Sequence, residues 1–350
     1  MRVHIDGIIF SLQSYGGITV YFRELLRRFK PEHNLSLTLE ERLQQQVRPL
    51  DFPAVRCIRR PARALERVRR CRPLDNAVPT VYHSSYYRRP ARTTDPVVVT
   101  VHDFVYERMV HGPRRLMHRW LMNGAIGNAQ HIICISEATR DDLMEFVPIR
   151  ADQTVSVIHN GVSDVFRPLA ATQTISPARP FVLFVGQRDG YKNFGLALRA
   201  LEHMPEIEMH CVGGGTLQPA ELADTPDAVR SRVRHLGFVD DEQLNTLYNR
   251  AQCLLYPSSY EGFGIPVLEA MRAGCPVVSI DCKAVLEVGG DALMVSKDPK
   301  DPFALAQAVR QTADAGLRRQ LGALGLKRSR QFSWDRCFEE TLGVYRSLQP

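Results

Sequence analysis

Two carboxylates stand eight positions apart in Tyr256–Ala270, where an apolar stretch leads through a glycine-containing loop into a helix-forming sequence. Glu261 follows the expected strand Cys253–Tyr256, and Glu269 lies about one turn inside the expected helix. Open α/β sheets bind their ligands at the carboxyl ends of the strands. This segment is therefore a candidate ligand site, in which Glu269 is placed to accept hydrogen bonds from ribose hydroxyls.

The loop between the two carboxylates is suited to an anion. Gly262 and Gly264 allow backbone N–H groups to come close to a ligand without interference from a Cβ atom. Pro266 fits the first helical turn, where its missing N–H costs nothing. The unpaired N–H groups and the positive dipole end of such a helix favour a phosphate. Phe263 and Ile265 belong to the same loop and complete this part of the candidate site.

A second candidate loop, Gly186–Asn193, follows the apolar stretch Phe181–Val185 and contains Arg188 and Lys192. An arginine offers a planar fork of donors and a lysine a point charge, so the two cations beside a helix start predict a pocket for a diphosphate. A solvated basic turn is the alternative interpretation of the same residues.

Further candidates lie at the ends of expected elements in the first half of the chain. The glycines Gly16 and Gly17 precede the first long helix, and His102 ends a buried strand. Ser136, Glu137 and Asn160 follow two later strands. A turn, a satisfied core histidine and a helix N-cap are the structural alternatives for these positions.

Composition limits the class of protein. A chain of 350 residues is long for one hydrophobic core, so two domains are expected. Hydrophobic residues at 44% and charged residues at 24% are typical of a soluble globular protein. We find no apolar run of about 18 residues and no signal peptide, and the eight cysteines form no Cys-x-x-Cys pair. A cytoplasmic protein with reduced thiols and no zinc site is expected.

The excess of positive charge lies entirely in the first half. Residues 1–170 carry 25 Lys and Arg against 17 Asp and Glu, whereas residues 171–350 carry 20 against 21. The densest group is Arg56–Arg72, with eight arginines and one glutamate, and a second group is Arg114–Trp120. Nucleic acid is not expected, since the basic residues are not interleaved with aromatics and no binding module is present. An anionic membrane surface attracts such a stretch by roughly 1 kcal/mol per nearby arginine. A solvated arginine-rich helix is the alternative.

Strands alternate with helices along both halves, which predicts an α/β protein with two Rossmann-like, doubly wound parallel sheets facing a cleft. Residues 1–168 are expected to form an acceptor-binding domain and residues 169–331 a nucleotide-binding domain, with a linker near Pro168–Pro180. Residues 332–350 are expected to form a helix. The predicted strands are 2–10, 97–101, 131–135, 155–159, 181–185, 208–212, 233–236, 253–256, 276–280 and 292–295.

The Glu-x7-Glu loop, the Arg/Lys loop, the Gly-Gly turn and the strand-terminal histidine occur in an order that resembles family 4 of the retaining GT-B glycosyltransferases, over nearly the whole chain. The resemblance is to the bacterial cell-envelope polysaccharide type. It implies that His102 contacts the transferred sugar, that Gly213 passes under the nucleotide and that Phe238 lies beside the base. It also implies that the terminal helix returns to the first domain, and that Ser136, Glu137 and Asn160 lie on the acceptor side. One departure is Tyr191, which stands where the family often has an arginine.

The implied reaction moves a hexose from a nucleoside-diphosphate sugar to a hydroxyl of a lipid-linked or saccharide acceptor and retains the α configuration. His102, Glu261, Lys192 and Arg188 are the expected catalytic residues, and no metal or other cofactor is required. GDP-mannose or a related GDP-hexose is the favoured donor, although UDP is not excluded by the sequence. The enzyme is expected to lie on the inner face of the plasma membrane through Arg56–Arg72. A nucleotide-sugar epimerase, a non-catalytic partner subunit and a dinucleotide oxidoreductase are the alternatives.

Overall fold

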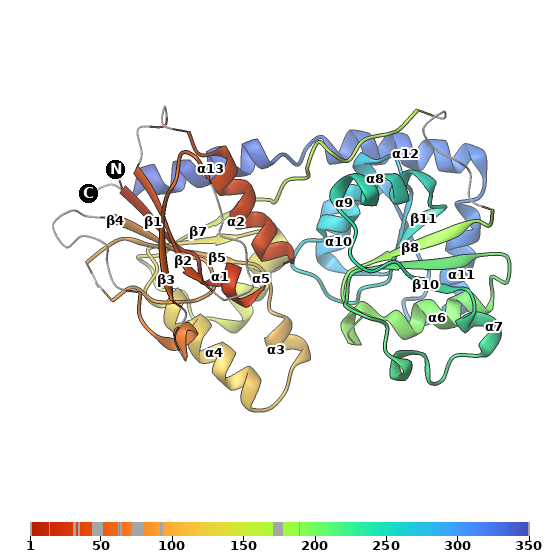
Figure 1. The fold of residues 1–350 in the computed structure, drawn as a ribbon, viewed down its shortest axis with the longest axis horizontal. Coiled ribbons are helices and arrows are strands. Elements are labelled where there is room, and N and C mark those ends of the chain that lie inside the picture. Colours follow the sequence, from red (N-terminus) through yellow and green to blue (C-terminus); the bar gives the residue numbers. More distant parts are fainter. Residues whose placement is uncertain are drawn as a thin grey trace. The chain divides into compact units, whose positions relative to one another are not determined.

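The computed structural model describes residues 2–13, 15–30, 33, 36–43, 52–61, 63, 65–71, 80–91, 94–170, 178–188 and 190–348. The chain divides into two compact units, which are described separately (Figure 1). Unit 1 comprises Met1–Gly161 and Trp334–Pro350, and unit 2 comprises Val162–Ser333.

Unit 1 is built on a parallel seven-stranded sheet with the strand order β3-β2-β1-β4-β5-β6-β7. The order runs outward in both directions from β1 and β4, so the carboxyl ends of these two strands form the switch point at which such sheets bind ligands. The strands are β1 (Arg2–Asp6), β2 (Ser36–Leu43), β3 (Arg56–Pro61), β4 (Thr80–Ser84), β5 (Val97–Val101), β6 (His131–Cys134) and β7 (Thr154–Val157).

Helices cover this sheet with their apolar faces. In α2, the residues Tyr21, Phe22, Leu25 and Leu26 recur at helical spacing and are buried. The helices of unit 1 are α1 (Ile8–Leu12), α2 (Gly17–Arg28), α3 (Val105–Met109), α4 (Pro113–Ile126), α5 (Glu137–Phe146) and α13 (Trp334–Ser347), with a short 3-10 turn at Glu66–Val68.

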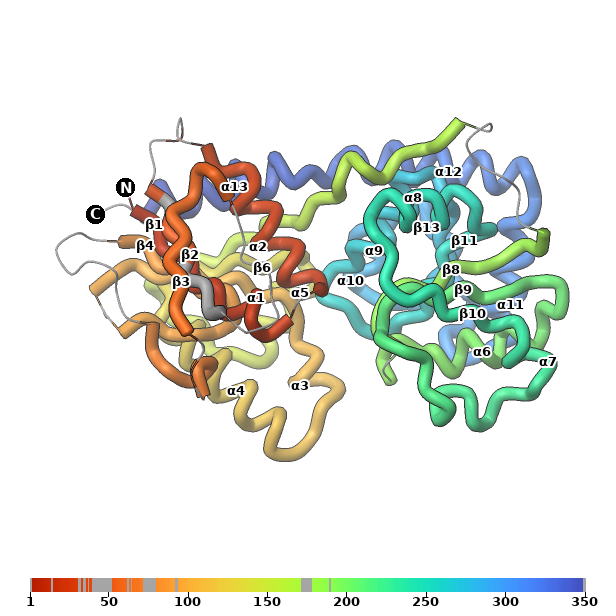
Figure 2. The backbone as a smooth tube through the Cα atoms, in the orientation of Figure 1, coloured from red at the N-terminus to blue at the C-terminus, as the bar shows by residue number. Residues whose placement is uncertain are grey.

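The terminal helix α13 packs in unit 1, to which the chain returns after unit 2 (Figure 2). The hydroxyl of Tyr345 lies 2.6 Å from Nδ1 of the buried His83. Trp334 packs edge-on against Tyr21, and Arg28 donates to Asp335 over 2.6 Å. A buried polar pair together with aromatic packing therefore fixes α13 to α2 and to the sheet.

Unit 2 contains a second parallel sheet, with the order β10-β9-β8-β11-β12-β13. Its strands are β8 (Phe181–Val185), β9 (Glu208–Val212), β10 (Val233–His235), β11 (Cys253–Tyr256), β12 (Val277–Ser279) and β13 (Leu293–Val295). Its α-helices are α6 (Phe194–Glu202), α7 (Asp227–Arg230), α8 (Asp241–Arg250), α9 (Ile265–Arg272), α10 (Lys283–Gly289), α11 (Pro302–Gln311) and α12 (Ala315–Ser329), with 3-10 turns at Gly190–Lys192, Pro219–Leu222 and Gly290–Ala292.

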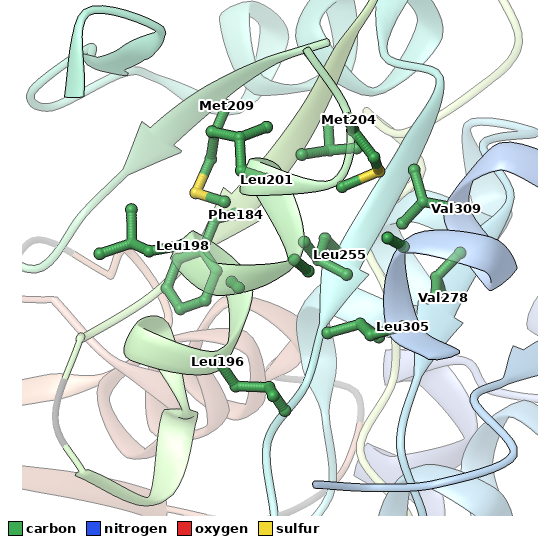
Figure 3. Packing of buried hydrophobic residues seen from close by; sticks show 14 of the residues in the cluster. Phe184, Leu196, Leu198, Leu201, Met204, Met209, Leu255, Val278, Leu305 and Val309 are labelled. Carbon is green, nitrogen blue, oxygen red and sulfur yellow. The ribbon is translucent and has the colours of Figure 1, made fainter. Parts of the chain in front are cut away.

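The core of unit 2 lies between this sheet and the helices α6 and α11 (Figure 3). Strand side chains such as Phe184 and Leu255 meet Leu201 of α6 and Leu305 of α11. Because both faces of a parallel sheet are covered, its strands are continuous apolar runs, which made them easy to recognise in the sequence.

The predicted α/β class with two Rossmann-like sheets is confirmed. The expected single strand over residues 2–10 is wrong, because the chain turns at Gly7 and residues 8–12 form α1. An arginine-rich helix within 56–72 is also wrong for the described residues. Arg56–Pro61 is a strand paired with β2, and only Glu66–Val68 is helical. Strand β4 was not predicted.

The two units divide after Gly161, earlier than the expected limit at residue 168, and again after Ser333. The segment after Gly161 packs in unit 2, where the backbone N–H of Arg167 donates to Asn245 and Asp164 forms an ion pair with Arg272. Of the linker expected near 168–180, residues 171–177 lie outside the described residues. No helix in the described part of the chain is long and apolar enough to cross a membrane.

Candidate functional site

The clearest polar cluster in unit 2 joins the two predicted loops through Lys192 and Glu261. Lys192 follows β8, Glu261 follows β11, and these two strands are neighbours in the sheet. The Nζ atom of Lys192 lies 2.5 Å from Oε1 of Glu261, and both side chains are nearly buried. Nζ also lies 3.4 Å from the hydroxyl of Tyr256. The sheet therefore brings a cation and a carboxylate together at the carboxyl ends of two adjacent strands.

Hydrogen bonds hold the Lys192 loop against the Glu261 loop. The carbonyl of Tyr191 accepts from the backbone N–H of Ser259 over 2.9 Å, and the side chain of Asn193 donates to the carbonyl of Pro257 over 2.9 Å. Asn193 has a left-handed conformation with φ of 54°, which asparagine tolerates better than most residues. The position of Lys192 is thus fixed from both sides.

Helix α9 begins beside this pair. Its N-cap is Gly264, with φ of 107°, and no side chain caps the helix. A residue other than glycine would be strained in this conformation. Pro266 occupies the first turn as predicted. The amino end of α9 therefore presents backbone N–H groups and a positive dipole end, which favour an anion.

Glu269 lies one turn further along α9 and makes a separate contact. It accepts a hydrogen bond of 2.9 Å from the hydroxyl of Tyr248, a fully buried residue of α8. Burial raises the pKa of Glu269 to about 7, and the hydrogen bond from Tyr248 opposes this rise. The ionisation of Glu269 is therefore sensitive to pH close to neutrality.

Arg188 is directed at the protein itself in this structure. Its Nε atom donates to Glu221 over 2.6 Å, and its two terminal nitrogens donate to the carbonyls of Gly213, Gly214 and Gly215 over 2.8 to 3.0 Å. The three glycines all have positive φ. A Cβ atom on Gly214 would come within 2.9 Å of the carbonyl of Gly186. Arg188 thus holds the Gly213–Gly215 loop at the end of β9 against the end of β8.

The remaining predicted residues of unit 2 differ in exposure. Phe238, which follows β10, is 69% exposed. Phe263 is buried and packs edge-on against Phe332, so its side chain belongs to the core. Gly262 is buried beside it, and Ile265 is half-buried at the start of α9.

In unit 1, His102 lies at the carboxyl end of β5, where the sequence placed it. Its imidazole is buried and packs edge-on against Tyr21, with ring centres 5.1 Å apart. Burial lowers the pKa of His102 to about 3, so the ring is neutral at physiological pH. Its Nε2 atom has no hydrogen-bond partner within the described part of the chain.

Several other buried polar atoms of unit 1 share this property, and two of them lie at or after the carboxyl ends of strands. The hydroxyl of Ser84 at the end of β4 and Oδ1 of Asn160 after β7 have no partner among the residues that the structure describes. A buried polar group without a partner costs about 1 to 3 kcal/mol, so such groups are often retained for a ligand. Ser84 and His102 end adjacent strands. The structure therefore adds Ser84 to the predicted residues His102 and Asn160.

Other predicted residues of unit 1 have structural roles. The hydroxyl of Ser136 accepts from the backbone N–H of Thr139 over 2.9 Å and so caps α5, and Glu137 forms an exposed ion pair with Arg140. Gly16 is the N-cap of α2, with φ of 154°, and Gly17 is its first residue. Contacts of these residues with a substrate stay predictions.

Several residues of the two clusters were not found from the sequence. Three of them contact residues that are far away in the sequence, so the local sequence does not indicate these contacts. They are Tyr248, Tyr256 and Glu221. Asn193 was recognisable only as the residue after Lys192. Ser84 was missed because β4 was not predicted.

Both halves of the chain match the profile of a known protein family. The profile described as Glycosyltransferase Family 4 matches residues 15–165, and the profile described as Glycosyl transferases group 1 matches residues 179–314. The O-antigen chain mannosyltransferase B of Escherichia coli is 29% identical over 287 residues, which span 77% of this chain and 74% of that protein.

Solved structures share the fold. Sucrose-phosphate synthase from Thermosynechococcus elongatus superposes with a TM-score of 0.80 at 21% identity, covering 99% of both chains. The Anabaena protein HepE, solved in complex with UDP and glucose, superposes with a TM-score of 0.71 at 14% identity, again over 99% of both chains. At these identities the likeness concerns the GT-B architecture alone.

Proposed function

Because the chain belongs to glycosyltransferase family 4 and has the GT-B fold, we propose that it transfers a hexose from a nucleoside-diphosphate sugar to an acceptor hydroxyl. The donor we favour is GDP-mannose or a related GDP-hexose. The similarity to an O-antigen mannosyltransferase supports this choice and supports a role in the assembly of lipopolysaccharide O-antigen or a similar envelope polysaccharide.

The observation that carries the proposal is the contact between Lys192 and Glu261 beside the amino end of α9. As the bond to the sugar breaks, negative charge develops on the departing diphosphate. Lys192 and the N–H groups of α9 stabilise this charge, which is the kind of contribution that usually dominates catalysis. Glu261 orients hydroxyl groups of the hexose and at the same time fixes Lys192.

Residues around the Lys192–Glu261 pair bind the nucleoside part of the donor. Glu269 accepts hydrogen bonds from the ribose hydroxyls, and the loops at Gly213 and Phe238 lie along the nucleotide and its base. Arg188 supports the diphosphate by holding the glycine loop, in addition to the direct contact that the sequence predicts. The backbone and pocket around the base determine whether guanine or uracil is accepted.

Residues of unit 1 contact the transferred sugar and the acceptor. The neutral ring of His102 serves as a hydrogen-bonding group toward the transferred sugar, because an imidazole with a pKa of about 3 carries no proton to donate as an acid. Ser84 and Asn160 provide further polar atoms for the acceptor side. The departing phosphate itself is the acceptor of the proton from the attacking hydroxyl, so no covalent nucleophile is assigned.

Two properties of the reaction follow from this assignment. The configuration at the anomeric carbon is retained, and no metal ion is required because Lys192 and the end of α9 supply positive charge. Proton NMR of the product tests the first property through its anomeric coupling constant. Activity that is unchanged after dialysis against EDTA supports the second, and activity that returns only with added Mg²⁺ or Mn²⁺ contradicts it.

Donor identity is tested by thermal shift. A nucleotide that binds the folded protein at 100 times its Kd stabilises it by about 2.7 kcal/mol, so the correct nucleotide raises Tm. GDP and GDP-mannose are expected to raise Tm more than UDP, ADP or their sugars. The transfer of labelled sugar from the preferred donor to acceptor lipids of a bacterial membrane extract then tests turnover. A larger Tm shift with UDP removes the GDP assignment but not the reaction class.

The acceptor we propose is lipid-linked or a saccharide, and the enzyme would then work at the inner face of the plasma membrane. Among the described arginines of the basic stretch Arg56–Arg72, five are exposed: Arg56, Arg59, Arg63, Arg69 and Arg70. An anionic leaflet attracts such groups. Co-sedimentation with vesicles tests this, and equal binding to anionic and neutral vesicles contradicts an electrostatic attraction.

A further inference from the structure

One surface of unit 1 exposes several large apolar side chains together. The described residues include ten large hydrophobic side chains that are exposed, and four of these fall between residues 109 and 120. Leu116 is 65% exposed, Met117 52% and Trp120 51%. The other six exposed side chains are spread over the rest of the chain: Leu12, Tyr15, Leu65, Met144, Phe238 and Phe303. The cluster is therefore a local feature and not a general property of the surface.

Helix α4, which lies on the outside of unit 1 (Figure 1), carries three of these four side chains. Its buried residues are His118, Leu121, Met122, Ala125 and Ile126, which dock it on unit 1. A surface helix of this kind normally places polar residues on its opposite face. Here Leu116, Met117 and Trp120 occupy that face at positions i, i+1 and i+4, and Met109 at the end of α3 is exposed as well.

Arginines surround these apolar side chains. Arg114 is exposed in the first turn of α4. Arg115 and Arg119 share the single carboxylate of Glu107, whose side chain is fully buried, so one positive charge of the three groups is not balanced. The guanidinium of Arg89 lies 5.0 Å from the ring centre of Trp120. We call Met109, Arg114, Leu116, Met117 and Trp120 the α4 surface.

Acidic groups near this surface do not cancel its charge. Asp142 and Glu145 of α5 both form ion pairs with Arg108 of α3. In total there are five positive groups and three negative groups. The positive groups are Arg89, Arg108, Arg114, Arg115 and Arg119, and the negative groups are Glu107, Asp142 and Glu145. The surroundings of the apolar side chains are thus positively charged.

We propose that the α4 surface docks on an anionic lipid bilayer. A tryptophan with neighbouring leucine and methionine side chains enters the boundary between headgroups and acyl chains, and the surrounding arginines contact lipid phosphates. The proposal rests on the proposed function only in that the acceptor is lipid-linked. It differs from attraction through Arg56–Arg72, because α4 contributes apolar side chains that insert, whereas the basic stretch contributes charge. Nucleic acid does not account for Leu116 and Met117, which have no role against a phosphate backbone.

Trp120 reports on this contact without any substitution. The chain has two tryptophans, and the second, Trp334, is buried at 2% exposure. The full-length protein is titrated with vesicles of phosphatidylethanolamine and phosphatidylglycerol, and separately with phosphatidylcholine alone. Tryptophan emission is expected to shift to shorter wavelength with the anionic vesicles, and lipids brominated in the upper acyl chain are expected to quench it. Binding of the vesicles without a shift or quenching overturns the proposal, as does an absence of binding.

Variants separate the α4 surface from the basic stretch. The substitutions Leu116→Ser and Trp120→Ser are each expected to lower partitioning onto anionic vesicles by roughly tenfold, since each removes one inserting side chain. Phe303→Ser is the matched control, because Phe303 is 47% exposed on α11 of unit 2, and it is expected to change nothing. If charge reversal at Arg56 and Arg59 abolishes binding while the α4 variants bind normally, the α4 surface is not the docking site.

Two further outcomes are distinguished. A shift of Trp120 emission that depends on protein concentration, without vesicles, would mean that a second copy of the chain covers α4, and this overturns the proposal. Transfer to a water-soluble acceptor is expected to be unchanged in Trp120→Ser, whereas Lys192→Ala is expected to lose transfer but keep vesicle binding. Transfer that persists in Lys192→Ala would therefore contradict the proposed function and not the docking surface.

Discussion

Lys192 and Glu261 come from loops 69 residues apart in the sequence, and their side chains meet at 2.5 Å where β8 and β11 end. Both side chains are nearly buried, so each needs the other: a buried charge without a partner is costly. The pairing also means that the cation is held in place before a donor arrives. An enzyme that presents charge in advance avoids reorganisation during the reaction.

The first prediction concerns this pair. Lys192→Ala is expected to lower kcat/KM by about 100- to 1,000-fold, the range found when one group that stabilises developing charge is removed. Glu261→Gln is expected to lower it as well, because Lys192 loses its fixed position. The double variant is expected to be scarcely worse than the poorer single variant, since the two groups act as a unit. Steady-state kinetics of the three variants, with circular dichroism as the control for folding, provides the test. Native activity in Lys192→Ala would contradict the assignment.

The second prediction concerns Arg188 and Glu221. If Arg188 supports the donor by holding the Gly213–Gly215 loop, then Glu221→Ala should raise the KM for the donor even though Glu221 is not expected to touch it. We expect increases of roughly 10-fold for Arg188→Ala and for Glu221→Ala, consistent with the loss of a hydrogen bond to a charged group. The double variant should show a similar increase. An unchanged KM in Glu221→Ala, beside a large effect of Arg188→Ala, would mean that Arg188 acts only by direct contact.

The third prediction is a dependence on pH through Glu269. Its carboxylate form accepts hydrogen bonds from ribose, and its pKa is raised to about 7 by burial. As pH falls through 7 the group becomes protonated, so donor KM is expected to rise on the acid side and to be constant on the alkaline side. Tyr248→Phe removes a donor that favours the charged form. The midpoint of the profile should therefore move to higher pH.

The pH profile of donor KM separates this role from a structural one. Loss of packing alone would raise KM equally at every pH. Glu269→Gln serves as the control, because it keeps the size of the side chain but does not titrate. This variant should bind donor weakly at all pH values and show no midpoint near 7. A midpoint that persists in Glu269→Gln would assign the titration to another group.

Much of the fold was visible in the sequence because parallel strands are continuous apolar runs. The predicted ranges of β5, β8, β9 and β11 agree with the structure residue for residue. Strand β4, Thr80–Ser84, was missed because three of its five residues, Thr80, His83 and Ser84, are polar. A helix was the alternative interpretation of the arginine-rich stretch 56–72, yet pairing with β2 makes residues 56–61 a strand. Tertiary pairing overrides local preference at such an edge.

The candidate site was predictable only in part, for a related reason. Lys192, Glu261 and His102 follow strands, and the carboxyl ends of strands are where ligands bind, so their positions carry information. The partners Tyr248 and Glu221 lie on helices or turns far along the chain. Nothing in their local sequence indicates that they contact Glu269 and Arg188. Similarly, the burial that shifts the pKa of Glu269 depends on the packing of α8 against α9.

The fourth prediction concerns the stability of unit 2. Arg232 is nearly buried at the start of β10, and its guanidinium donates to four backbone carbonyls at 2.6 to 2.9 Å, those of Leu201, Met204, Ile207 and Ala228. These carbonyls belong to the end of α6, the turn before β9 and helix α7. In Arg232→Ala each carbonyl loses a hydrogen bond from a charged group, although those of Leu201 and Met204 keep a backbone N–H donor. We expect a loss of about 3 to 4 kcal/mol in the free energy of unfolding.

Arg234→Ala is the matched control for Arg232→Ala. Arg234 lies two residues away and pairs with Glu208 at the surface, where an ion pair contributes at most about 1 kcal/mol. Calorimetry should show a fall in Tm of roughly 10 °C for Arg232→Ala, and hydrogen exchange should locate the lost protection in α6 and β9. Equal stability of the two variants would mean that water replaces the guanidinium at the four carbonyls. In that case the burial of Arg232 would not be needed to hold α6 and α7 to the sheet.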